Sequence, residues 1–138
     1  MERRDFIRQS CTLCIAMGAG LLVGSLESCN PVYMTISSEN KINVPLSLFD
    51  KKDLQIIRAK PLEYDFALRK EKTGKFTALL LRCTHADNPL MSTGKEFVCD
   101  LHGSRFNIEG GVTQGPAEES LKKYSTEVIS DSIIITLS

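Results

Sequence analysis

The sequence predicts an all-β domain, and three observations support that fold class. Apolar residues recur at alternate positions in short runs, turn residues separate these runs, and no long window shows the 3.6-residue period of a helix. With 138 residues, of which 42% are hydrophobic and 25% charged, the chain can form one domain with a buried core. We therefore expect an all-β sandwich or barrel-like domain over residues 41–138.

The charge pattern excludes a nucleic-acid partner. The formal net charge is zero, the charges are interspersed, and no basic run or aromatic platform stands beside lysines. The five cysteines form an odd, scattered set that does not resemble a disulfide framework: Cys11 with Cys14, Cys29 alone, and Cys83 with Cys99. Because Cys11 and Cys14 lie inside an apolar run, we interpret them as small hydrophobic residues.

Residues 1–29 are interpreted as an export signal and set aside from the fold. A basic start that includes Arg3 and Arg4 precedes an apolar run over residues 11–26. The stretch Arg3-Arg4-Asp5-Phe6-Ile7 resembles the twin-arginine export motif. That route carries proteins that are already folded and loaded with any cofactor they bind.

The end of this signal predicts how the chain is held at the membrane. The sequence Leu26-Glu27-Ser28-Cys29 resembles a bacterial lipoprotein cleavage box, with Cys29 as the acylated first residue. The alternative is an uncleaved anchor, although the apolar run would span only roughly 24 Å as a helix against a hydrocarbon core of roughly 30 Å. Both readings predict an exported domain, membrane-anchored on the periplasmic side. Residues 30–40, which are polar and lack an apolar period, are expected to form a tether.

Short strands are expected along the rest of the chain. Lys72-Thr73-Gly74-Lys75 predicts a hairpin turn, and Ser130-Asp131 predicts a second one. Residues 117–123 are expected to form a short helical turn. The strands are predicted at residues 42–48, 54–57, 64–68, 76–81, 96–98, 124–129 and 133–137.

The residues that carry chemistry lie between these strands, in two mixed pairs. Cys83-Thr84-His85 follows one strand, and after thirteen residues Cys99-Asp100-Leu101-His102 follows another. These are the two histidines that the chain contains. Two thiolates and two imidazoles form a complete four-ligand set for a metal centre, so we expect two loops to bring them together at one tip of the domain.

The double pair resembles the Rieske 2Fe-2S protein family. The second pair continues as Gly103-Ser104, Gly115-Pro116-Ala117 matches the loop that covers the cluster in that family, and a looser similarity extends from Ile42 to Leu137. The resemblance implies an antiparallel β-sandwich of short strands with a two-loop cluster-binding tip. It also implies a 2Fe-2S cluster with Cys83 and Cys99 on one iron and His85 and His102 on the other. Supporting residues would be Gly103, Ser104 as a hydrogen-bond donor to a bridging sulfide, and Pro116.

Two departures from the family pattern bear on the reduction potential. High-potential members have a disulfide between the two cluster loops, but the matching positions here are Asn88 and Leu101, so we expect packing and the cluster itself to hold the loops together. Those members also have a tyrosine that hydrogen-bonds a cysteine sulfur, where this chain has Phe106. With that donor lost, the potential is expected in the lower or middle part of the Rieske range of about −150 to +300 mV.

Three functions remain open from the sequence. The leading hypothesis is a one-electron carrier that relays electrons between redox protein partners at the outer face of the membrane. The second is the Rieske subunit of a quinol-oxidising or other respiratory complex. The third is a structural zinc domain, although zinc fingers usually pair Cys with Cys and His with His. Without further histidines or a second cofactor motif, the chain alone cannot be a Rieske oxygenase.

Overall fold

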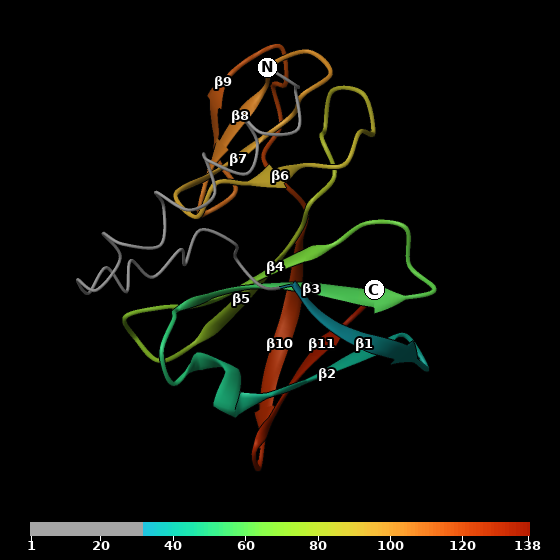
Figure 1. The fold of residues 1–138 in the computed structure, drawn as a ribbon, viewed down its shortest axis with the longest axis vertical. Coiled ribbons are helices and arrows are strands. Elements are labelled where there is room, and N and C mark those ends of the chain that lie inside the picture. The colour runs from blue at the N-terminus through green and yellow to red at the C-terminus, as the bar shows by residue number, and fades with distance from the viewer. Residues whose placement is uncertain (1–31) are drawn as a thin grey trace, which may run out of the picture.

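A computed structural model of the chain describes residues 32–138, which form eleven strands and one short 3-10 helix (Figure 1). Seven strands close into a barrel: β1 (Val32–Ser38), β2 (Lys41–Pro45), β3 (Leu54–Lys60), β4 (Phe66–Lys70), β5 (Phe76–Leu80), β10 (Lys123–Ile129) and β11 (Ser132–Thr136). The other four form a small sheet above the barrel in Figure 1: β6 (Met91–Ser92), β7 (Glu96–Val98), β8 (Arg105–Asn107) and β9 (Val112–Gln114). The 3-10 helix covers Leu46–Phe49. Within residues 32–138, no helix is long and apolar enough to span a bilayer.

The barrel order is β1-β2-β11-β10-β5-β4-β3, and β1 closes it by pairing with β3. That closing pair is parallel, whereas the other strand pairs of the described residues are antiparallel. Closing the sheet removes its exposed edges. The expected all-β class is confirmed, with the larger sheet in its barrel form and a second small sheet beside it.

Two cores explain why β3, β4 and β5 each contain consecutive apolar residues. One face of these strands, including Ile57 and Ala78, fills the barrel interior. The opposite face, including Ile56 and Leu79, contributes to a second core shared with the small sheet. Because side chains alternate between the two faces of a strand, a strand covered on both faces needs apolar residues at successive positions. Cys83 and Cys99 lie in this second core, together with Phe97 and Phe106 of the small sheet.

The expected tether and the expected helical turn were both wrong. Residues 30–40 were expected to be a tether, but residues 32–38 form β1, which pairs with both β2 and β3. In β1 the apolar residues Val32, Met34 and Ile36 face outward and the residues between them face inward. This is the reverse of the alternation expected for a strand that buries one apolar face. Residues 117–123 form no helical turn; they run as a loop into β10. The export signal and Cys29 lie outside the described residues, and the statements about them stay predictions.

The other expected strands are present, except that the strand predicted over residues 42–48 ends at Pro45 and its last three residues lie in the 3-10 helix Leu46–Phe49. Both predicted hairpin turns are confirmed. Gly74 between β4 and β5 has φ +83°, and its N–H donates to the Glu71 carbonyl at 2.9 Å. Ser130 between β10 and β11 has φ +53°. The sequence missed β6, β8 and β9, which are only two or three residues long. An element of that length contains too few positions to show an alternating pattern.

Core packing on the last hairpin can be tested with a matched pair of variants. Ile133 on β11 is 0% exposed and Ile129 on β10 is 52% exposed. We expect Ile133→Val to reduce the free energy of unfolding by about 0.5–1.5 kcal/mol, because one buried methylene is lost and the cavity closes only in part. Ile129→Val is expected to stay within about 0.5 kcal/mol of the parent chain. Denaturant unfolding measures both, and equal effects would contradict the inward orientation of Ile133.

Candidate metal centre

Three loops at the small-sheet end of the molecule hold the residues singled out from the sequence. The first loop covers residues 82–90 between β5 and β6, the second covers residues 99–104 between β7 and β8, and the third covers residues 115–122 between β9 and β10. The first loop follows a strand of the barrel, and the second lies within the small sheet. The second core therefore lies directly beneath the place where the loops meet.

The first loop is held in a tight turn around Cys83. The Cys83 N–H donates to the Asn88 carbonyl at 2.8 Å, and the Asp87 N–H donates to the Cys83 carbonyl at 3.0 Å. From the barrel side, the Tyr64 hydroxyl donates to the Asp87 carbonyl at 2.7 Å. These bonds direct the Cys83 side chain into the second core, where it is 0% exposed, and leave His85 exposed to solvent.

The second loop repeats this arrangement around Cys99. The Cys99 N–H donates to the Ser104 carbonyl at 2.9 Å, and the Gly103 N–H donates to the Cys99 carbonyl at 3.0 Å. Gly103 has φ +78°, a conformation that other residues adopt only with strain, which explains a glycine at this turn. The side chain of Gln114 donates to the Gly103 carbonyl at 2.9 Å. Cys99 is 0% exposed, and His102, like His85, is exposed.

The third loop, which contains Gly115-Pro116-Ala117, is hydrogen-bonded to both of the others. The Thr84 hydroxyl donates to the Glu119 carbonyl at 2.7 Å, and the Ala117 N–H donates to the Ser104 hydroxyl oxygen at 3.0 Å. Ser104 is 0% exposed and is the buried polar side chain among residues 32–138. Its oxygen accepts from Ala117, so its own hydrogen remains free to be donated. Pro116 itself is exposed.

The four candidate ligands meet as two like pairs. The Cys83 and Cys99 side chains are buried in the same core cluster. The His85 and His102 rings lie edge to face, with their centroids 5.0 Å apart. Within residues 32–138, no group of three or more Cys, His, Asp or Glu side chains is arranged to hold a single ion. Both cysteines are free thiols. A two-iron cluster takes two ligands on each iron, and this donor set fits it as one thiol pair and one imidazole pair.

The surroundings of Cys99 favour its thiolate form, which is the form that binds metal. Burial opposes ionisation, but hydrogen bonds from the backbone N–H groups of His102 and Leu101, with smaller contributions from the Cys83 and Asn88 side chains, outweigh it. Together they hold the pKa of Cys99 below its ordinary value. N–H groups that stabilise a thiolate also stabilise the negative charge that a sulfur-bound cluster gains on reduction.

Asn88 is the residue that sequence reasoning undervalued. The loops were expected to be held by packing and the cluster alone, but the Asn88 amide nitrogen lies 2.7 Å from an Asp100 carboxylate oxygen and 3.7 Å from the Cys99 sulfur. It also lies 3.1 Å from the Pro89 carbonyl oxygen. One side chain of the first loop therefore binds the second loop at two points. No local pattern around Asn88 signals this, because Cys99 and Asp100 are eleven and twelve residues away.

The fold is shared with known iron-sulfur proteins, and comparison identifies the family. The model of the Rieske 2Fe-2S domain matches residues 45–125, more than half of the chain. The chain belongs to the Rieske 2Fe-2S family. Its cofactor is accordingly a Rieske-type 2Fe-2S cluster, and its activity is electron transfer through that cluster. This finding disfavours the structural zinc alternative.

Individual relatives extend the comparison. The cytochrome b6-f complex iron-sulfur subunit of Chlorobaculum thiosulfatiphilum is 27% identical over 98% of this chain and 75% of that protein. The cytochrome b6-f complex iron-sulfur subunit 3 of Nostoc sp. strain PCC 7120 is 43% identical over 41% of this chain and 30% of that protein. Among solved structures, the plasma membrane Rieske protein PetC3 from Synechocystis PCC 6803 matches with a TM-score of 0.57 and 25% identity, covering 69% of this chain and 98% of that one. Naphthalene 1,2-dioxygenase shares the fold, with a TM-score of 0.57 and 22% identity, over 72% of this chain and 26% of that one.

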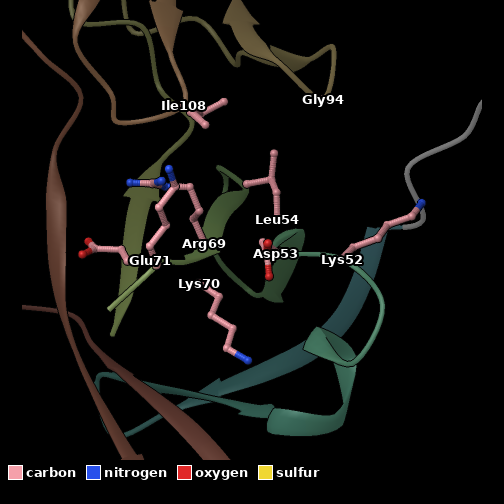
Figure 2. Close-up of a pocket in the computed structure, with 9 residues that line it drawn as sticks. Lys52, Asp53, Leu54, Arg69, Lys70, Glu71, Gly94 and Ile108 are labelled. Carbon is pink, nitrogen blue, oxygen red and sulfur yellow. The ribbon is translucent and has the colours of Figure 1, made fainter. Parts of the chain in front are cut away.

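A cavity of about 570 Å³ lies away from the Cys and His residues of the Rieske domain (Figure 2). Its lining combines Lys52, Asp53, Arg69, Lys70 and Glu71, so positive and negative groups are mixed. Figure 2 shows Lys52 and Lys70 pointing away from Arg69, whose guanidinium lies 3.5 Å from Glu109. Because acidic side chains stand among these cations, we assign this cavity no ligand.

Proposed function

We propose that this Rieske protein is a one-electron carrier in which Cys83 and Cys99 ligate one iron and His85 and His102 ligate the other. The observation that carries the proposal is the contrast between the pairs: both thiols are fully buried, and both imidazoles are exposed. A bound 2Fe-2S cluster supplies one reversible oxidation–reduction step. The exposed edge formed by His85 and His102, here called the histidine tip, is where an electron can pass to a partner, because the protein leaves these side chains uncovered.

The chain's own residues would set the properties of that step. Neutral imidazoles leave the cluster less negative than four thiolates, which raises its potential relative to plant-type ferredoxins. Ser104 would donate its free hydroxyl hydrogen to a bridging sulfide, while Ala117 of the third loop holds the hydroxyl oxygen in place. Phe106 is fully buried and has no hydroxyl to add a second such bond. This supports a potential below the top of the Rieske range.

The partner is proposed to be a redox protein. Leu101, beside His102, is 55% exposed and gives the histidine tip an apolar edge of the kind that forms the centre of protein interfaces. We also propose that the domain is exported and held at the outer face of the membrane through residues 1–29, with a lipid on Cys29. The twin-arginine-like start and the cleavage-box-like Leu26-Glu27-Ser28-Cys29 support this.

A second candidate is the Rieske subunit of a quinol-oxidising or other respiratory complex. It is favoured by the Chlorobaculum relative, which is named as a cytochrome b6-f complex subunit and aligns with 98% of this chain. It is disfavoured by Phe106 and by the missing loop disulfide, since high-potential members have the corresponding tyrosine and bridge.

One preparation tests the two functions. Full-length protein purified from membranes is expected to show a single one-electron wave in film voltammetry at pH 7, with a midpoint clearly below about +300 mV. Mass spectrometry of the same sample is expected to find a lipid-modified Cys29 at the N-terminus. A midpoint near +300 mV with residues 1–28 retained would instead support the quinol-oxidising subunit.

A further inference from the structure

The outer face of β1 is apolar in a place where a barrel strand normally meets water. Val32, Met34 and Ile36 are 39%, 57% and 77% exposed, although they alternate with residues that point inward. Tyr33, between them, packs against the barrel core. A strand with one face in a core and the other in water is expected to have polar residues outside. Here Val32, Met34 and Ile36 lie on the outer face instead.

Cations border this apolar stripe. The parallel register places Arg58 of β3 beside Met34 and Lys60 beside Ile36, and the antiparallel register places Lys41 of β2 beside Ser38. Arg58 is bound at 2.8 and 2.7 Å by the two carboxylate oxygens of Asp65. In the part of the chain that the structure describes, Lys41 and Lys60 form no ion pair.

The position of β1 in the chain indicates what this surface meets. β1 begins at Val32, three residues after Cys29, and three residues span at most about 11 Å. A lipid on Cys29 would therefore keep the start of β1 close to the bilayer surface. This step rests on the membrane attachment in the proposed function.

We propose that the outer face of β1 lies on an anionic phospholipid bilayer. The side chains of Val32, Met34 and Ile36 enter the boundary between headgroups and acyl chains, and Lys41 and Lys60 reach the lipid phosphates. Figure 1 shows β1 at one side of the barrel and the small sheet, which bears the second and third loops, above the barrel. In this orientation the histidine tip stays free of the membrane and accessible to a protein partner.

Tryptophan fluorescence gives a direct test, because the chain contains no tryptophan. Met34 on β1 and Met91 on β6 are matched sites, being 57% and 56% exposed. Full-length, lipid-bearing Met34→Trp and Met91→Trp proteins are each reconstituted into vesicles of phosphatidylglycerol and phosphatidylethanolamine, with and without brominated acyl chains. We expect bromine to quench the emission of Met34→Trp and to leave that of Met91→Trp unchanged. Adding Ile36→Glu to Met34→Trp is expected to abolish the quenching, because the carboxylate opposes insertion.

The outcomes separate this inference from the proposed function. The visible absorption of the cluster confirms that each variant is folded, and Ile36→Trp replaces Met34→Trp if that variant loses its cluster. Vesicle flotation tests membrane attachment by itself. Protein that does not float overturns both the attachment through residues 1–29 and this orientation. Protein that floats with Met34→Trp unquenched, or with both reporters quenched equally, overturns the β1 contact alone. Met34→Trp emission that changes with protein concentration and not with bromine shows a second copy on β1, and also overturns it.

Discussion

Cys99→Ser is expected to lose nearly all of its iron and acid-labile sulfide while the seven-stranded barrel stays folded. A serine hydroxyl ionises far less readily than a thiol and is a harder ligand, so it replaces a cysteine thiolate poorly on a cluster iron. The barrel should survive because Cys99 belongs to the second core, whereas the barrel interior is formed by other side chains. Metal and sulfide analysis measures the loss, and far-ultraviolet circular dichroism monitors the fold.

Two further variants make this result specific to the ligand set. Thr35→Ser changes a side chain of barrel strand β1, outside the loops, and is expected to keep the full cluster content. His102→Cys keeps four donors but replaces an imidazole with a thiolate, so any cluster that assembles is expected to shift its midpoint towards about −400 mV. Full iron and sulfide in Cys99→Ser, or an unchanged midpoint and spectrum in His102→Cys, would exclude that residue as a ligand.

Asn88→Ala is expected to lower the midpoint potential by about 20–60 mV, which for a one-electron couple corresponds to roughly 0.5–1.5 kcal/mol, the net value of one hydrogen bond. The Asn88 amide lies 3.7 Å from the Cys99 sulfur, and a donor to sulfur stabilises the added electron. The variant also removes the 2.7 Å contact with Asp100 that joins the two loops. We therefore expect faster loss of the cluster on warming.

The potential distinguishes a hydrogen bond from a merely structural role. Asn43→Ala changes an exposed asparagine on β2, far from the loops in sequence and fold, and is expected to leave the midpoint unchanged. Asp100→Ala removes the loop contact but keeps the donor to Cys99, so it should increase cluster loss without lowering the midpoint. An Asn88→Ala protein with an intact cluster and the parental midpoint would show that the amide does not bond the sulfur.

Much of this protein follows from short-range patterns. The two hairpin turns were predictable because positive φ at Gly74 and Ser130 depends on local turn chemistry. The strands that bury apolar residues were predictable from alternation. The candidate ligands were evident because two Cys and two His recur at ligand spacing. In the structure Cys83 and Cys99 share one core cluster, and the His85 and His102 rings lie edge to face.

What could not be predicted depends on contacts between segments distant in sequence. β1 has its apolar residues on the outside, so only its pairing with β2 and β3 reveals it as a strand. Ser104 is a turn residue in the sequence, and its bond to Ala117 exists only because the third loop crosses the second. The same holds for Asn88, whose partners belong to another loop.

The sequence alone therefore determined the all-β class, the donor set and its resemblance to the Rieske family, because each is encoded within a few neighbouring residues. Only the tertiary structure decided which side chains hold the loops together and which face of the barrel is left apolar. Those features depend on strand register and on which strand ends meet, and both are settled when the barrel closes and the small sheet packs on its outer surface.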